Sequence, residues 1–118
     1  MLRKSAKPLI AVAAIAAIAA TAGCGVNKDA DTAQGRQLFV QSCGSCHALS
    51  EAGTKGNIGP NLDDAFKESI SNGLGRSTIE GVVKGQIALP QGSQMPANIV
   101  KGKQAKQVAE YVAQAVKG

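Results

Sequence analysis

Residues 43–47 of the sequence, CGSCH, place two thiols and one imidazole within five residues. Two residues separate Cys43 from Cys46, and His47 follows the second cysteine directly. The pattern C-x-x-C-H is the attachment signature of c-type haem, because both thiols can add to the vinyl groups of one porphyrin. The histidine is then placed beneath the iron as its proximal ligand. We therefore predict one covalently bound haem on Cys43 and Cys46, with His47 on the iron.

Other chemistries of a cysteine pair have to be weighed against haem. A C-x-x-C pair also forms disulfides and thiol redox sites, although a thioredoxin-like motif requires a βαβ pattern that this sequence lacks. Zinc requires four ligands. The chain has three cysteines and one histidine in all, so a fourth zinc ligand could only be Cys24 or a carboxylate. We favour haem, because the five-residue signature is specific when it occurs in an exported chain.

The second axial ligand of the iron follows by elimination. His47 is the only histidine of the chain, and Met95 is the only methionine after the initiator. A thioether is a known partner of histidine on electron-transfer haem iron. We therefore predict Met95 as the sixth ligand. In the alternative, Met95 only fills the core. The sixth ligand would then be a lysine amine such as that of Lys84 or Lys101, or the sixth site would be open.

The N-terminal residues have the three parts of a secretory signal peptide. Arg3, Lys4 and Lys7 give a basic start, residues 9–20 (LIAVAAIAAIAA) form an uncharged apolar run, and small residues follow. A retained membrane anchor is the alternative, but a spanning helix needs about 20 apolar residues and this run is shorter. We therefore predict that residues 1–23 are a cleaved signal peptide and that the remainder is exported.

Residues 21–24 (TAGC) resemble the lipobox of bacterial lipoproteins, in which the cysteine is acylated and becomes the new N-terminus. The sequence departs from that pattern at Thr21, where leucine is usual. A rival A-x-A site at residues 20–22 would leave Cys24 as a free thiol and the protein soluble in the periplasm. We favour lipidation of Cys24, followed by a polar tether over residues 24–31 and one domain over residues 32–118.

Export changes the interpretation of the net charge. The whole chain carries 13 basic and 8 acidic residues, a net charge of +5. Without the three basic residues of the signal peptide, 10 basic residues face 8 acidic ones, and the net charge is +2. The basicity is therefore largely that of the signal peptide, and it does not indicate a nucleic-acid partner.

The remainder of the chain predicts an all-α domain of three to five helices, because no segment alternates like a strand. Glycine and proline punctuate residues 48–62 and 88–98, which we predict as loops. Gly35 costs about 1 kcal/mol against alanine inside a helix, which suggests that a second helix crosses there. The first expected helix covers residues 32–41, and a short second helix starts at Asp63 or Asp64. A third is capped by the S-x-x-E motif of residues 77–80 and ends at Gly85, and a terminal helix covers about residues 105–116.

With these motifs in order, the chain resembles the class I cytochromes c over about residues 33–117. The shared features are Gly35 and Phe39 in the first helix, CGSCH, GPNL at 59–62, the pair Met95–Pro96, and a terminal helix with Tyr111. The resemblance implies the small cytochrome c fold around one haem. It also implies that Gly35 and Phe39 pack against the terminal helix near Tyr111.

The resemblance assigns a role to Pro60 as well. Its carbonyl would accept a hydrogen bond from the free ring N–H of His47, which fixes the ring and makes the ligand more electron-rich; the alternative is a plain turn proline. Tryptophan, which many relatives place near the haem propionates, is absent here. Asn61 and Gln94 are the polar candidates for contacting the propionates. The thin aromatic content fits a domain whose centre is filled by porphyrin.

Iron with histidine and methionine on its two faces has no open position and suits one-electron exchange. We therefore predict a monomeric electron carrier, not an enzyme, lipid-anchored on the outer face of the cytoplasmic membrane. The resemblance suggests a quinol-oxidising cytochrome complex and a terminal oxidase as its partners. One alternative is a gas- or peroxide-binding protein in which Met95 is displaceable. Another is a module in which the haem is only a structural staple.

Overall fold

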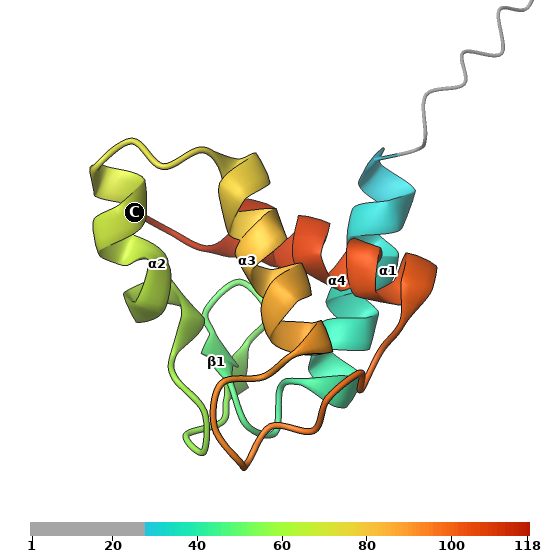
Figure 1. The fold of residues 1–118 in the computed structure, drawn as a ribbon. Coiled ribbons are helices and arrows are strands. Elements are labelled where there is room, and N and C mark those ends of the chain that lie inside the picture. Colours follow the sequence, from blue (N-terminus) through green and yellow to red (C-terminus); the bar gives the residue numbers. More distant parts are fainter. Residues whose placement is uncertain (1–27) are drawn as a thin grey trace, which may run out of the picture.

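The computed structural model describes residues 28–118, which form four helices and one small hairpin around a single core (Figure 1). The predicted signal peptide and Cys24 lie outside these residues. Within them, no helix combines the length and apolar character needed to cross a bilayer. The elements in chain order are α1 (Lys28–Ser42), β1 (Ala48–Leu49), β2 (Thr54–Lys55), α2 (Leu62–Ser71), α3 (Arg76–Ala88) and α4 (Gly102–Ala115).

The predicted all-α class is confirmed, with one local correction. Residues 48–62 were expected to be loop, but β1 and β2 pair antiparallel within them, with Ala48 opposite Lys55 and Leu49 opposite Thr54. The hairpin escapes a periodicity search because each strand has only two residues. It is closed by Gly53, whose φ of 70° lies in the left-handed region that glycine adopts without strain.

Helices α1 and α4 cross at Gly35, as the sequence predicts. A Cβ added to Gly35 would lie 2.2 Å from the backbone oxygen of Gln107 and 2.8 Å from the Cβ of Tyr111. Beside this crossing, the rings of Phe39 and Tyr111 pack in a tilted arrangement with their centroids 5.9 Å apart. The Tyr111 hydroxyl donates to the Glu51 carboxylate, which ties the hairpin loop to the helix pair. The contact expected from the resemblance is therefore present.

Helix α1 begins four residues earlier than predicted, at Lys28 rather than Thr32. Residues 28–31 therefore belong to the helix and not to a tether. The reason is a contact that the local sequence does not show: the side-chain amide of buried Gln107 donates to the Asp31 carboxylate at 2.8 Å. A carboxylate in the first turn also stabilises the helix dipole.

Helix α3 differs from the prediction at both ends. It begins at Arg76 after Gly75, so Ser77 is inside the first turn and the expected S-x-x-E cap does not form. The Arg76 guanidinium donates to the backbone oxygen of Ala113, which fixes this first turn on α4. Gly85 does not end the helix, which continues to Ala88. Burial of Ile87 in the core, where its side chain is only 3% exposed, accounts for the extra turn.

Helix α2 lies at the edge of the molecule, and none of its residues is fully buried (Figure 1). It begins at Leu62 because the Asn61 side chain accepts from the Asp63 backbone N–H at 3.0 Å and so caps the helix. The chain terminus holds it from the other side, where the Lys117 N–H donates to the Asp63 carboxylate at 3.2 Å. The expected start at Asp63 or Asp64 is therefore wrong by one or two residues.

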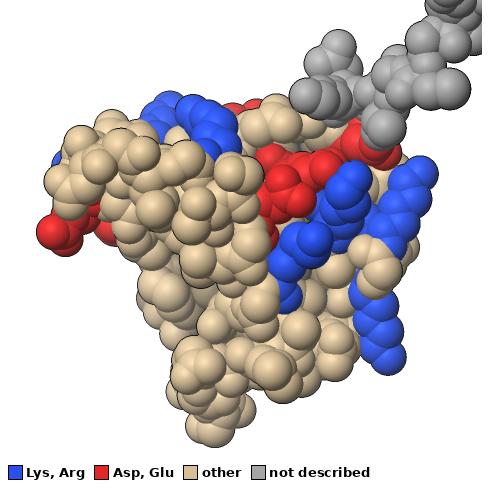
Figure 2. Space-filling model, turned by 45° about the horizontal axis from the view of Figure 1, so that its top comes forward, with Lys and Arg blue, Asp and Glu red and all other residues tan. Residues whose placement is uncertain are grey.

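Charged side chains are unevenly spread over the surface. Figure 2 shows basic and acidic groups intermixed on one side of the molecule and a broad uncharged area beside them. One ion pair joins α4 to α1, with Lys103 4.0 Å from Asp31, and another lies within α4, with Lys106 3.1 Å from Glu110. Pairs this exposed contribute little to stability.

Candidate functional site

The CGSCH segment continues directly from the end of α1. The backbone N–H of Cys43 donates to the carbonyl of Phe39 at 2.8 Å, and the His47 N–H donates to the carbonyl of Cys43 at 2.9 Å. Phe39 is itself 1% exposed, so the turn starts from a residue fixed in the core. The packed helix pair therefore sets the position of both cysteines and of the histidine.

These residues line a cavity of about 900 Å³ between α1, α3 and the loop that follows α3. Cys43, Cys46, His47, Pro60 and Met95 all contribute to its wall, together with aliphatic and aromatic side chains. Cavities of about 300–1,000 Å³ with mostly apolar walls are typical of cofactor sites. Among the described residues that line it, none is an aspartate, glutamate, lysine or arginine. Its size, apolar wall and converging sulfur and imidazole groups fit a covalently bound porphyrin.

The ring of His47 is held from two sides. Its Nδ1 lies 2.9 Å from the carbonyl oxygen of Pro60. A carbonyl can only accept, so Nδ1–H is the donor and Nε2 keeps the lone pair that a metal would use. Gly59 packs against the ring, since a Cβ added there would lie 2.5 Å from Cε1. The contact with Pro60 is the one that the resemblance implies.

The hairpin supports the same segment from behind. The Thr54 hydroxyl donates to the backbone carbonyl of His47 at 2.9 Å and accepts from the Leu49 N–H at 3.0 Å. Gly56 lies against the backbone between Cys46 and His47, where a Cβ would come within 2.5 Å of a carbonyl carbon. From sequence, Gly56 is only loop punctuation, Gly59 is part of the GPNL motif with no assigned contact, and Thr54 belongs to no motif. Their contribution depends on contacts across the loop, and the available clues were the density of glycines after CGSCH and the GPNL motif.

Met95 is partly buried in the wall of the same cavity, on the loop between α3 and α4. The side-chain amide of Gln86, on α3, approaches its sulfur with Nε2 4.0 Å from Sδ. Neither Lys84 nor Lys101, the alternative iron ligands considered from sequence, is part of the cavity wall. The structure therefore brings the predicted thioether, and neither of these amines, into the cavity that His47 lines. Gln86 was missed because it belongs to no motif.

The buried thiol of Cys43 differs from that of a reactive redox cysteine. Both are free cysteines, and burial, with the nearby Cys46 thiol adding to it, raises the pKa of Cys43 to about 11. Reactive C-x-x-C cysteines have lowered pKa values instead. Among residues 28–118, no group of three or more histidine, cysteine, aspartate or glutamate side chains is placed to hold a metal ion. A raised thiol pKa and the lack of a fourth zinc ligand among the described residues both fit haem attachment better than the alternatives.

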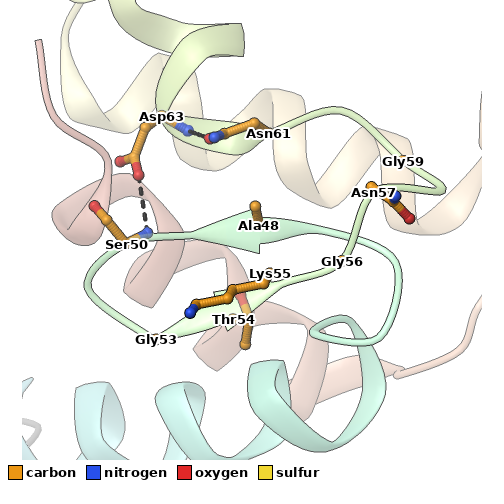
Figure 3. Close-up of a pocket in the computed structure, with 10 residues that line it drawn as sticks. All are labelled: Ala48, Ser50, Gly53, Thr54, Lys55, Gly56, Asn57, Gly59, Asn61 and Asp63. Carbon is orange, nitrogen blue, oxygen red and sulfur yellow. Dashed lines mark hydrogen bonds between the residues drawn. The ribbon is translucent and has the colours of Figure 1, made fainter.

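The two amides proposed as propionate partners differ in position. Gln94 belongs to the cavity wall, whereas Asn61 does not and instead caps α2. Asn61 faces a second, open cleft of about 730 Å³ along the hairpin. Figure 3 shows its polar groups, with Asp63 accepting from the Ser50 N–H at 2.9 Å. Of these contacts, the one between Ser50 and Asp63 joins the hairpin to α2, and the one between Asn61 and Asp63 caps α2.

Comparison with known proteins agrees with this geometry. Residues 32–115 match the sequence family Cytochrome c, so the chain belongs to the cytochrome c family. The fold is similar to that of the c-type cytochrome SorU from Sinorhizobium meliloti, with a TM-score of 0.60 and 29% sequence identity over 75% of this chain and 93% of that chain. Membership of the family confirms the predicted covalent c-type haem with its iron. Domains of this family are typically electron carriers rather than enzymes, and they are generally extracytoplasmic.

Proposed function

We propose that the protein is a one-electron carrier whose haem iron is ligated by His47 on one face and by Met95 on the other. The observation that carries this proposal is the shared cavity, whose wall contains both thiols, the imidazole and the thioether. When bound, the haem supplies a centre that cycles between ferric and ferrous states. Axial methionine raises the potential of such a centre.

The residues of the chain would hold the centre nearly unchanged between the two states. Cys43 and Cys46 attach the porphyrin, so it cannot be lost in an open compartment. The Nδ1–H of His47 donates a hydrogen bond to the Pro60 carbonyl, and Gly59 packs against the ring. Both contacts restrict rotation of the ring. The mostly apolar wall would limit the access of water to the iron. These constraints favour rapid electron exchange with little rearrangement.

The rival function, binding of peroxide or a diatomic gas, is less well supported by the cavity wall. Peroxide chemistry uses an acid or base on the side of the iron opposite the proximal histidine. Among the described residues of the wall, His47 and the two attachment cysteines are the only groups that titrate. The side of the cavity around Met95 presents glutamine, serine and aliphatic side chains instead.

The Met95→Ala variant tests the ligand assignment. We expect it to retain covalent haem, to bind CO in the reduced state and to have a lower reduction potential than the parent, because a strong ligand is lost. Leu89→Ala is the matched control, since Leu89 is on the same loop but is 76% exposed and outside the cavity wall. A Met95→Ala protein with unchanged potential and no CO binding would exclude Met95 as the ligand.

We further propose that the carrier operates as a monomer on the outer face of the cytoplasmic membrane, anchored by lipid on Cys24. Its partners would be redox complexes such as a quinol-oxidising cytochrome complex and a terminal oxidase, met through brief contacts of small area. Firm anchoring requires more than one acyl chain. Cys24→Ser should move the protein from the membrane fraction to the soluble fraction. Retention in the membrane fraction would indicate an uncleaved signal peptide instead.

A further inference from the structure

The loop that carries Met95 is closed at its base by α3. Helix α3 ends at Ala88 and is capped by Leu89, whose N–H donates to the Gly85 carbonyl at 2.9 Å. The chain then returns so that the Asn98 N–H donates to the Ile87 carbonyl at 2.8 Å. Asn98 has a φ of 54°, a left-handed conformation that asparagine tolerates better than most residues. The base of the loop is therefore fixed within the final turn of α3.

Gln86 immediately precedes Ile87 in this turn. Its side chain is partly buried and belongs to the cavity wall, and its amide nitrogen reaches across the closed loop to Met95 Sδ at 4.0 Å. Its neighbours in the wall, Val82, Val83 and Ile87, are aliphatic. Partial burial of an amide beside aliphatic side chains is costly unless the amide has a partner. The thioether is the partner that the structure provides for its N–H group.

We propose that Gln86 is a positioning residue for Met95, whose N–H holds and polarises the thioether sulfur. The inference rests on the proposed role of Met95 as iron ligand. A thioether sulfur has two lone pairs and is a weak acceptor. With one lone pair directed to the iron and the other towards the amide, the sulfur is restricted to one orientation.

Two measurable consequences follow from this contact. First, Met95 resists displacement, so an added ligand competes with it less well. Second, the positive end of the N–H dipole points towards the sulfur and the iron beyond it, which disfavours the ferric state. Loss of the amide should therefore weaken the retention of Met95 and lower the reduction potential together. A residue that only filled space would not be expected to change both properties in these directions.

The test compares imidazole binding to the ferric haem protein, followed by absorbance, in the parent and in Gln86→Leu. We expect the variant to bind imidazole about two- to fivefold more tightly, the equivalent of one weak hydrogen bond lost. Its potential, measured by redox titration, should be lower than that of the parent. Gln114→Leu, the same exchange at an exposed position of α4, should match the parent in both measurements.

Gln86→Glu separates the amide donor from packing, because glutamate has nearly the same shape and its carboxylate cannot donate. It should bind imidazole more tightly than the parent, as the leucine variant does. Parent-like imidazole affinity in either Gln86 variant would overturn the inference. Met95→Ala distinguishes this failure from that of the proposed function. If Met95→Ala opens the iron while Gln86→Leu matches the parent, only the inference fails. If Met95→Ala also matches the parent, the ligand assignment fails.

Discussion

Helix α1 contributes both to the crossing with α4 and to the cavity beside it, but the apolar side chains of these two regions are covered to different extents. At the crossing, Phe39 and Tyr111 are only 1% and 2% exposed, and backbone atoms of α4 lie directly against Gly35. Around the cavity, by contrast, Ile58 is 62% exposed and Val82 is 50% exposed, although both belong to its wall. The first region is closed by protein atoms alone.

This difference shows what the haem contributes to the fold. In the second region, the apolar side chains would find their packing partner in the porphyrin, which would take the place of a protein core. Changes at the crossing should therefore alter the stability of the whole domain. Changes at the cavity should alter the attachment and ligation of the haem first, and stability only through them.

The largest expected effect is in the cavity. The double variant Cys43→Ala, Cys46→Ala should lose all covalent haem, because no thioether can form. The measurement is haem staining of the denatured protein after electrophoresis. Ser45→Ala, between the two cysteines, is the matched control and should stain like the parent. Colour retained by the denatured double variant would contradict the attachment assignment.

At the crossing, Gly35→Ala should lower the free energy of unfolding by about 3 kcal/mol, because rigid backbone at Gln107 leaves no room for a methyl group. Gly85→Ala is the matched exchange in an open part of a helix, since among the described neighbouring atoms none lies within 4 Å of the added Cβ. That exchange in a helix should stabilise the protein by about 0.5–1 kcal/mol. Denaturant titration of both haem proteins measures the difference. Equal effects would show that the crossing is not closely packed.

Gly59→Ala is expected to have an effect confined to the ligand. Its methyl group would displace the His47 ring and strain the bond to Pro60, while both thioethers remain intact. We expect full covalent haem, altered absorption bands and a loss of about 1–2 kcal/mol in stability. The same Gly85→Ala protein serves as the control. Unchanged bands would mean that the ring does not depend on Gly59.

The smallest effect is expected at Asp63, outside both regions. Burial opposes ionisation of this carboxyl, but hydrogen bonds from the Ser50 and Lys117 N–H groups outweigh it and lower its pKa. Ionised Asp63 therefore stabilises the folded protein above its unfolded-state pKa near 3.8. This stabilisation is lost as the pH falls through the lower pKa of the folded state. Asp63→Asn should be slightly less stable than the parent at pH 7 and equal to it in strong acid. Thermal unfolding at both pH values tests this, and a constant difference would refute it.

Sequence predicted the parts of the molecule whose chemistry or conformational free energy depends on neighbouring residues alone. CGSCH predicted the covalent haem because the spacing of its thiols suits one porphyrin. Gly35 predicted a crossing because a glycine inside a helix is unfavourable without a packing reason. The helical spacing of apolar residues over 105–116 predicted the terminal helix, in which Val108 and Val112 are each 1% exposed.

The parts that sequence did not predict depend on contacts between distant segments. Asp31 extends α1 because Gln107, 76 residues later, donates to it. Helix α3 passes Gly85 because Ile87 is buried. Gly56 and Gly59 are spaced like ordinary loop glycines, and their contacts with the CGSCH segment arise only when the hairpin folds back. No periodicity in a single sequence contains this information.

In the carrier that we propose, His47 and Met95 close both faces of the iron. The most direct test is the visible absorption of the purified protein, first oxidised, then reduced, then reduced under CO. We predict a c-type spectrum with sharp reduced bands that CO does not shift, as expected of iron with two strong ligands. A clear shift under CO would show an open or labile sixth position. It would contradict the role of Met95 and place gas binding before electron transfer.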